Sequence, residues 1–247
     1  MRCLDVRKRE DEILDLLVDS YIKKSHPISS SSLCQEYNLP YSSATIRNVL
    51  ESLEKKGFLS HPHTSSGRVP TKDGFKHYVE SLSKDKESLL KETLIEDLFD
   101  IDSIGDFQDI LDRVLTGLSN ISGYISLIGI WGEREGFFFK GARYILDQPE
   151  FEDIIKLRNL FYALEVKIDE LQDLLFQCID EELKIFIGDD IGFEEISDCS
   201  LLMSGFKEKD FSLTLALLGP MRMNYTKACE SLYSIKCGLE NTVKRLL

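Results

Sequence analysis

The first eighty residues divide into short stretches with helical apolar spacing, and proline and glycine separate these stretches. Helices are expected at about residues 7–24, 29–37 and 42–56, because apolar side chains recur three or four positions apart in each. Pro27 ends the first, since proline disfavours helix at the residue before it. Gly57 ends the third, because glycine readily takes the left-handed conformation that closes many helices. Such a chain can bury a core only by packing several short helices together.

A turn-rich stretch follows the third helix, and two short extended segments flank it. Residues 58–61 and 68–70 enclose residues 62–67, which are rich in serine, proline and glycine, so a β-hairpin is expected. Thr71 then caps a fourth helix. Three helices, a hairpin and a further helix follow one another in the order of a winged helix-turn-helix domain, which is expected over residues 1–82.

The third helix is the candidate reader of nucleic acid. Opposite its apolar stripe it carries Arg47 and Asn48, which suit base edges because arginine pairs with guanine and asparagine with adenine. The hydroxyls of Ser42, Ser43 and Thr45 suit phosphates or groove walls. The alternative is that these hydroxyls only cap the helix and that Arg47 and Asn48 are solvated surface residues.

The hairpin offers more groups that can contact phosphates or a minor groove, namely His63, Ser65, Ser66 and Arg68. Two other interpretations stay open here: a solvated surface turn, and a metal site built on His61 and His63. Alternating histidines without a cysteine or carboxylate at ligand spacing are a weak metal signal. Neither a metal nor a cofactor is therefore expected.

The net charge of −13 at first argues against a nucleic-acid partner. The charge is unevenly spread, however. Residues 1–80 hold 12 Lys and Arg against 11 Asp and Glu, and the remaining residues hold 18 against 32. The first part can therefore approach the phosphates of double-stranded DNA without a large repulsive field.

The rest of the chain is expected to form a linker helix over residues 83–116 and an α+β domain over residues 117–247. This second domain combines extended runs with two long helices, at about residues 149–178 and 224–247. The runs expected as strands are 121–130, 137–146, 183–187, 191–206 with interruptions, and 211–218. No histidine occurs after His77, so a Ser-His-Asp or Cys-His centre cannot form within this domain, and an enzyme is not expected.

The six cysteines are scattered and include no Cys-x-x-Cys pair, and the opening MRCLDVRKRE is charged rather than apolar. The apolar runs are far shorter than the roughly 20 residues that a membrane span requires. A cytoplasmic protein with reduced thiols and no membrane partner is expected.

Motifs in both parts of the chain point to one family. The first part contains SSATIRN at residues 42–48, HTSSGRVPT at 63–71 and GFKHYV at 74–79, and the second contains LDQPEF at 146–151 and LGPMRMNY at 218–225. Together and in this order they resemble the heat-inducible transcription repressors of the HrcA family. Motifs in both parts make this resemblance far more specific than the order of helices alone.

The resemblance implies a negative regulator of transcription in the stress response. It implies a homodimer that binds an inverted-repeat operator upstream of heat-shock chaperone operons and is released on heat stress, with a chaperonin as co-regulator. It also implies a GAF-like domain, which in the family holds an inserted dimerisation domain. Few residues lie between 121–130 and Gly141, so a reduced GAF-like domain is expected here. Ser29 and Ser31 stand where the family usually has glycine and arginine.

Two other classes of function stay open from the residues alone. One is a winged-helix regulator whose C-terminal domain senses a small molecule, which ligand-dependent release from DNA would indicate. The other is a metal hydrolase that uses His61 and His63, which stoichiometric metal in the purified protein would indicate.

Overall fold

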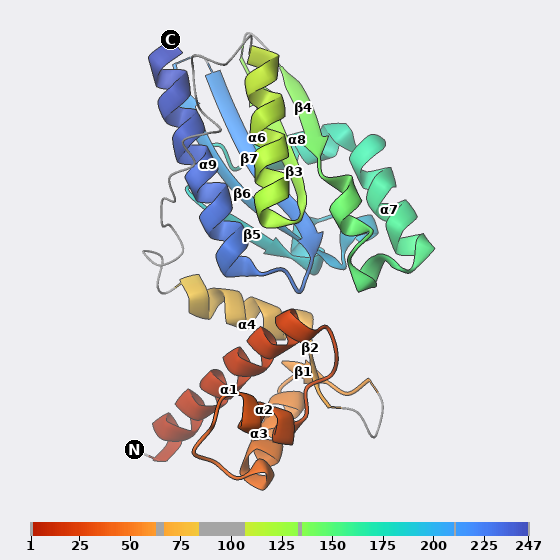
Figure 1. Ribbon diagram of the computed structural model, residues 1–247, viewed down its shortest axis with the longest axis vertical. Helices are drawn as coiled ribbons and strands as arrows, with labels where there is room; N and C mark the ends of the chain where they lie inside the picture. Colours follow the sequence, from red (N-terminus) through yellow and green to blue (C-terminus); the bar gives the residue numbers. More distant parts are fainter. Residues whose placement is uncertain (1, 63–66, 84–106, 133–134, 210, 247) are drawn as a thin grey trace. The chain divides into compact units, whose positions relative to one another are not determined.

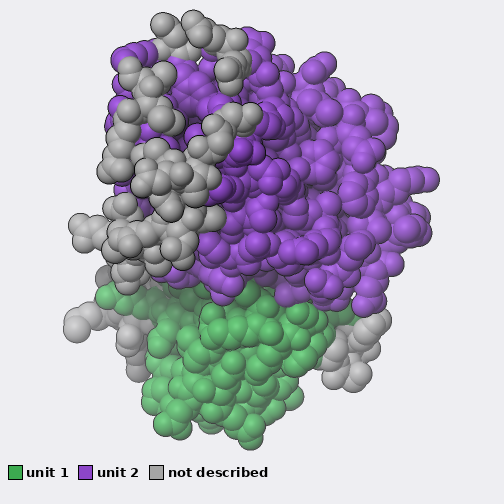
Figure 2. Space-filling model, turned by 45° about the horizontal axis from the view of Figure 1, so that its top comes forward, with its two compact units in different colours: residues 1–85 green, residues 86–247 purple. Residues whose placement is uncertain are grey.

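The computed structural model describes residues 2–62, 67–83, 107–132, 135–209 and 211–246. The chain divides into two compact units, residues 1–85 and 86–247, which Figure 2 colours separately. Each unit buries its own set of apolar side chains. Each unit therefore has its own hydrophobic core, as a separate domain does.

The described part of the first unit contains four helices and a two-stranded hairpin (Figure 1). The helices are α1 (Arg2–Lys24), α2 (Ser30–Glu36), α3 (Ser43–Lys55) and α4 (Lys72–Ser83). The strands β1 (Leu59–Ser60) and β2 (Val69–Pro70) pair antiparallel. Three helices, a hairpin and a fourth helix thus follow in the expected order.

The core of this unit forms because each helix turns an apolar stripe inward. On α3 the inward residues are Ile46, Leu50 and Leu53, each at most 3% exposed, and α3 packs against α1 and α2. Burying each of these side chains stabilises the fold by about 1.5–3 kcal/mol. Val49, expected on the same face, is only half-buried because it stands at the border of the stripe.

A third extended residue joins the hairpin. The N–H of Ile28 donates to the Arg68 carbonyl at 2.9 Å, and the N–H of Arg68 donates to the Ile28 carbonyl at 2.8 Å. Gly67 permits this approach, since a Cβ there would lie 2.3 Å from both the carbonyl carbon and the carbonyl oxygen of Ile28. The hairpin is therefore fixed to the segment that leads into α2.

The second unit is built on a five-stranded antiparallel sheet in the order β4-β3-β7-β6-β5. The strands are β3 (Ile125–Trp131), β4 (Gly136–Lys140), β5 (Lys184–Ile187), β6 (Cys199–Glu208) and β7 (Phe211–Pro220). The helices are α6 (Phe107–Ser122), α7 (Ile154–Glu165), α8 (Ile168–Phe176) and α9 (Tyr225–Leu246). Short 3₁₀ turns are η3 (Ala142–Ile145), η4 (Pro149–Phe151), η5 (Gly188–Ile191) and η6 (Glu194–Ile196).

Helices cover both faces of this sheet (Figure 1). On one face α6 and α9 pack together against the strands, and α8 packs with α7 on the other face. The central strands β3, β7 and β6 are buried over nearly their whole length. Strands buried on both faces read as continuous apolar runs rather than as alternating patterns. The mixed helix and sheet content confirms the expected α+β class.

Three strand boundaries expected in this unit are wrong. The run expected over 191–206 is a strand only from Cys199 on, because η5 and η6 occupy its first residues. The other two boundaries lie beside glycines. The strand expected over 121–130 begins later, because α6 runs to Ser122 and Gly123, at φ +78°, then turns the chain. The strand expected over 137–146 ends at Lys140, since Gly141 takes a φ of +86° and η3 follows. In both places an apolar run continues past a glycine that redirects the backbone.

The single helix expected over residues 149–178 is also wrong, because it consists of η4, α7 and α8. Asp153 caps α7 by accepting a hydrogen bond from the N–H of Ile155 at 2.9 Å. The chain breaks again at Lys167, whose Nζ lies 2.8 Å from a carboxylate oxygen of Glu195. A tertiary ion pair of this kind leaves no trace in the helical pattern.

The linker helix expected over 83–116 falls partly outside the described residues, which omit 84–106. Residues 107–116 belong to α6, which packs on β3 and α9. This end of the expected linker is thus part of the second unit's core.

Arg222 connects two parts of the second unit that are far apart in sequence. Its guanidinium forms an ion pair with Glu150, and its Nη2 donates to Gln148 Oε1 at 2.9 Å. Beside it, the N–H of Asn224 donates to Tyr124 Oη at 2.8 Å. The motifs LDQPEF and LGPMRMNY therefore meet in space.

Replacement of Gly67 by alanine is expected to lower the free energy of unfolding of the first unit by about 1–3 kcal/mol, because the added methyl group collides with the Ile28 backbone. Calorimetry of the whole chain measures the loss. Gly57→Asn is the matched control, since this glycine has open space around it and asparagine tolerates its positive φ. Equal stability of Gly67→Ala and wild type would contradict the close approach.

Arg222→Ala is expected to destabilise the second unit by about 1–3 kcal/mol, because it leaves the carboxylate of Glu150 without its cation. Denaturant unfolding can be followed by the fluorescence of Trp131, the only tryptophan in the sequence. The double variant Arg222→Ala, Glu150→Gln should lose less than the sum of the two single losses. Strictly additive losses would show that the two side chains do not interact.

Candidate nucleic-acid interface

Serine hydroxyls fix the N-termini of α2 and α3. Ser29 caps α2, and the side chain of Ser42 caps α3 by accepting a hydrogen bond from the N–H of Thr45 at 3.1 Å. A cap of this type stabilises a helix by about 1 kcal/mol. The Oγ atoms of Ser30 and Ser43 lie 3.1 Å apart, so the two helix N-termini are tied directly to each other.

On α3, the two side chains expected to contact DNA bases are open to solvent. Arg47 and Asn48 are both exposed. Within the part of the chain that the structure describes, neither side chain has a hydrogen bond or an ion pair. These two groups can therefore bind an external partner without breaking an internal contact.

The three hydroxyls expected at phosphates have internal partners as well. Ser42 and Ser43 are exposed and Thr45 is half-buried, and the hydroxyl oxygens of Ser42 and Thr45 lie 2.9 Å apart. Ser42 thus serves as a cap, as the alternative interpretation expected. A hydroxyl oxygen carries two lone pairs, so an exposed capping serine keeps the capacity to bind a second group.

Arg68 points into the first unit rather than away from it. Its Nε lies 2.8 Å from a carboxylate oxygen of Glu54 on α3, and its Nη1 lies 2.9 Å from Nδ1 of His61. The side chain is only 16% exposed. His63, Ser65 and Ser66 lie outside the described residues.

Sequence reasoning missed two residues at this surface, Ser30 and Glu54. Ser30 was hidden in a run of four serines, where no local pattern singles out the one that meets Ser43. Glu54 stands fourteen residues before Arg68, and only the fold of the hairpin brings the two together. Spacing along one helix could have revealed neither contact.

Four ion pairs with distances below 3 Å join cations and carboxylates among the described residues of the first unit. The pairs are Lys23–Asp19 at 2.6 Å, Lys24–Glu36 at 2.6 Å, Lys56–Glu10 at 2.5 Å and Arg68–Glu54 at 2.8 Å. The hydrogen bond from Lys24, together with one from Ser20, holds the pKa of Glu36 below its ordinary value. These pairs reduce the positive field of the unit and leave Arg47 as an exposed, unpaired cation on α3.

A metal site and a membrane-spanning helix have no support in the described residues. No group of three or more histidine, cysteine or acidic side chains among them could hold a metal ion, and His61 lies against Arg68. None of the described helices is long and apolar enough to cross a membrane.

One solved structure is similar in fold over nearly the whole chain. It is the crystal structure of a hypothetical protein at 2.2 Å resolution, with a TM-score of 0.76, 17% identity, and coverage of 97% of this chain and 98% of that one. At this identity the similarity concerns the fold alone.

Curated relatives match nearly the full chain. A heat-inducible transcription repressor HrcA from Oceanobacillus iheyensis is 26% identical, over 96% of this chain and 97% of its own length. The HrcA repressor from Symbiobacterium thermophilum is 23% identical, over 92% of this chain and 96% of its own length. The first alignment extends over 341 residues although this chain has 247, so the relative carries segments that this chain lacks.

A family model supports the same assignment. The model of the HrcA protein C-terminal domain matches residues 79–229, which is more than half of the chain. The match includes the two second-unit motifs that meet at Arg222. The chain belongs to the HrcA family of heat-inducible transcription repressors.

Proposed function

We propose that the first unit is a winged helix-turn-helix domain and that α3 enters the major groove of an inverted-repeat operator upstream of heat-shock chaperone operons. The observation that carries this proposal is that Arg47 and Asn48, on the helix that follows the α2–α3 turn, are exposed and have no hydrogen bond or ion pair with other described residues. The antiparallel hairpin and its pairing with Ile28 support the winged domain.

In this proposal the base contacts come from Arg47 and Asn48. Both follow closely on the N-terminus of α3, the end of a recognition helix that reaches base edges. The hydroxyls of Ser42, Ser43 and Thr45 and the free N–H groups of the helix N-terminus contact phosphates beside the groove. The Ser30–Ser43 contact keeps α2 in place over the DNA backbone.

The hairpin contributes in two ways. His63, Ser65 and Ser66 contact phosphates or the minor groove. Arg68 holds the hairpin at the correct angle to α3, because its ion pair with Glu54 and its contact with His61 occupy the guanidinium. This positioning role replaces the direct phosphate contact that the sequence suggests for Arg68.

The second unit completes the repressor as a reduced GAF-like domain. Its antiparallel sheet with helices on both faces supports this assignment. The active form is a homodimer, because two copies of α3 one helical turn apart match the two halves of an inverted repeat. A chaperonin acts as co-regulator and heat stress releases the genes. No specific observation favours a small-molecule sensor in this unit.

Arg47→Ala is expected to weaken binding to the operator about 5–150-fold, because one bidentate base contact discriminates by about 1–3 kcal/mol. Titration of labelled operator and of a scrambled duplex at one fixed salt concentration measures both affinity and specificity. Lys227→Ala, which removes an exposed cation from α9, is the matched charge control. If the variant has the affinity and the base preference of the wild type, Arg47 does not contact a base.

Arg68→Ala and Glu54→Gln are expected to weaken operator binding together, with the slope of affinity against salt concentration unchanged. A direct phosphate contact instead lowers that slope by about 1. Binding isotherms across a salt series, with circular dichroism to confirm folding, separate the two cases. If the slope of affinity against salt concentration falls in Arg68→Ala but not in Glu54→Gln, Arg68 contacts a phosphate directly.

A further inference from the structure

β4 is a free edge of the five-stranded sheet. Within the described residues it pairs with β3 on one side and with no strand on the other. An edge strand presents unpaired backbone N–H and C=O groups, which proteins commonly protect with charges, proline or a bulge. β4 instead carries Phe137, Phe138 and Phe139 in a row, and all five of its residues are only half-buried.

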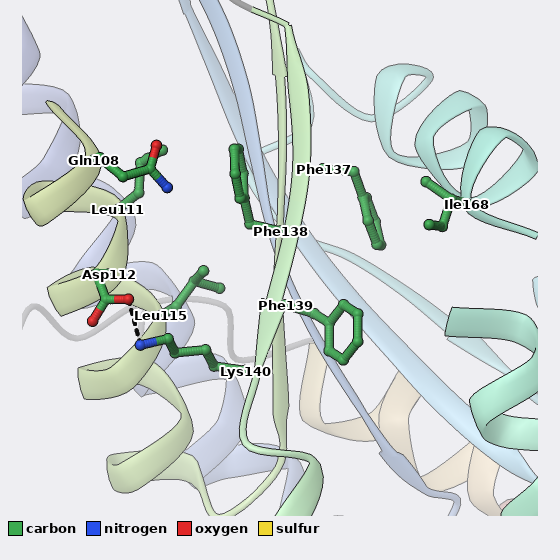
Figure 3. Close-up of a pocket in the computed structure, with 9 residues that line it drawn as sticks. All are labelled: Gln108, Leu111, Asp112, Leu115, Phe137, Phe138, Phe139, Lys140 and Ile168. Carbon is green, nitrogen blue, oxygen red and sulfur yellow. Dashed lines mark ion pairs between the residues drawn. The ribbon is translucent and has the colours of Figure 1, made fainter. Parts of the chain in front are cut away.

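A hollow of about 260 Å³ lies beside this edge (Figure 3). Phe138 points to the face of the sheet that α6 covers, where Leu111 lines the hollow. The two neighbouring phenylalanines point to the opposite face, towards Ile168 at the start of α8. The open edge is therefore bordered by apolar side chains on both faces of the sheet.

The cation of this strand is already neutralised. Lys140 forms an ion pair with Asp112 of α6, drawn as a dashed line in Figure 3, and its Nζ lies 3.3 Å from Thr116 Oγ1. The strand thus presents no unpaired charge of its own. This matters because the chain carries a net charge of −13, so two copies repel each other and associate more easily through a surface strand without an unpaired charge.

We propose that two copies of this chain pair along β4 and join their sheets into one continuous sheet. The strand is centred on Phe138, so antiparallel pairing about a two-fold axis places Phe138 opposite its own counterpart. Phe137 then faces the partner's Phe139, and Gly136 faces the partner's Lys140. Aromatic side chains thus meet at three consecutive positions across the seam, which is the junction of the two β4 strands. The free backbone groups of both edges are paired there.

The surface next to the strand extends the contact. Val166 is 61% exposed and stands two residues before Ile168, which lines the hollow. A five-residue strand alone is small compared with the roughly 800 Å² per partner that stable interfaces bury. Added apolar area beside the seam brings a two-fold pair nearer to that size.

The inference deepens the homodimer of the proposed function by locating its interface, and it is tested without DNA, so the two can fail separately. Phe138→Cys chains are oxidised gently and separated on a non-reducing gel. Opposed residues of an antiparallel pair have Cα atoms about 4.5–5.5 Å apart, within the range of a disulfide. Most of the chain is expected to cross-link to a species of twice 28.3 kDa.

Glu135→Cys is the matched control, because this exposed position precedes the same strand. In the proposed register the two copies of residue 135 lie about 20 Å apart, so cross-linking should stay at the wild-type background. The wild type also controls for the native thiols. Sedimentation equilibrium of the unoxidised wild type is expected to give the mass of a dimer.

A second pair of variants keeps the test valid if Phe138→Cys does not fold. Phe137→Cys and Phe139→Cys chains should cross-link when mixed and much less when oxidised separately, because only residues 137 and 139 of different copies are opposed. A monomeric wild type overturns the proposal. So does a dimer that cross-links at neither set of positions, or one that cross-links equally at Glu135→Cys.

Discussion

The backbone pairing between Ile28 and Arg68 is the interaction on which the first unit's proposed reading surface depends. Two hydrogen bonds hold the hairpin to the segment before α2, while the Arg68 side chain reaches Glu54 on α3. One residue therefore joins the hairpin, α2 and α3. Because the approach leaves no room for a side chain on Gly67, the relative position of these elements is set by backbone contact rather than by adjustable side chains.

The second unit meets a different constraint. Its sheet is covered by helices on both faces, so the strands can be almost wholly apolar and still avoid water. Further growth of such a sheet can occur only at its two edges. Those edges are β4 and β5: β5 begins with the exposed Lys184, whereas β4 carries the phenylalanine run and its Lys140 is paired with Asp112.

The sequence predicted features that depend on neighbours along the chain and missed those that depend on tertiary contact. The stripe of α3 and the cap at Ser42 are local, and both were predicted. The ion pairs of Lys167 with Glu195 and of Arg68 with Glu54 join residues far apart in the sequence, so no helical periodicity predicts them. For the same reason the phenylalanine run of β4 resembles a buried strand, although it lies at an edge.

The ion pairs of the first unit have a consequence for how such a repressor would search a genome. Binding to unrelated DNA is almost entirely electrostatic, and its strength follows the number of cations free to replace counterions. Among the described residues of the unit, four cations are held by carboxylates, which lowers the number free to replace counterions and so weakens binding to random sequence. Unrelated DNA then sequesters few molecules, so a small population can occupy its operators.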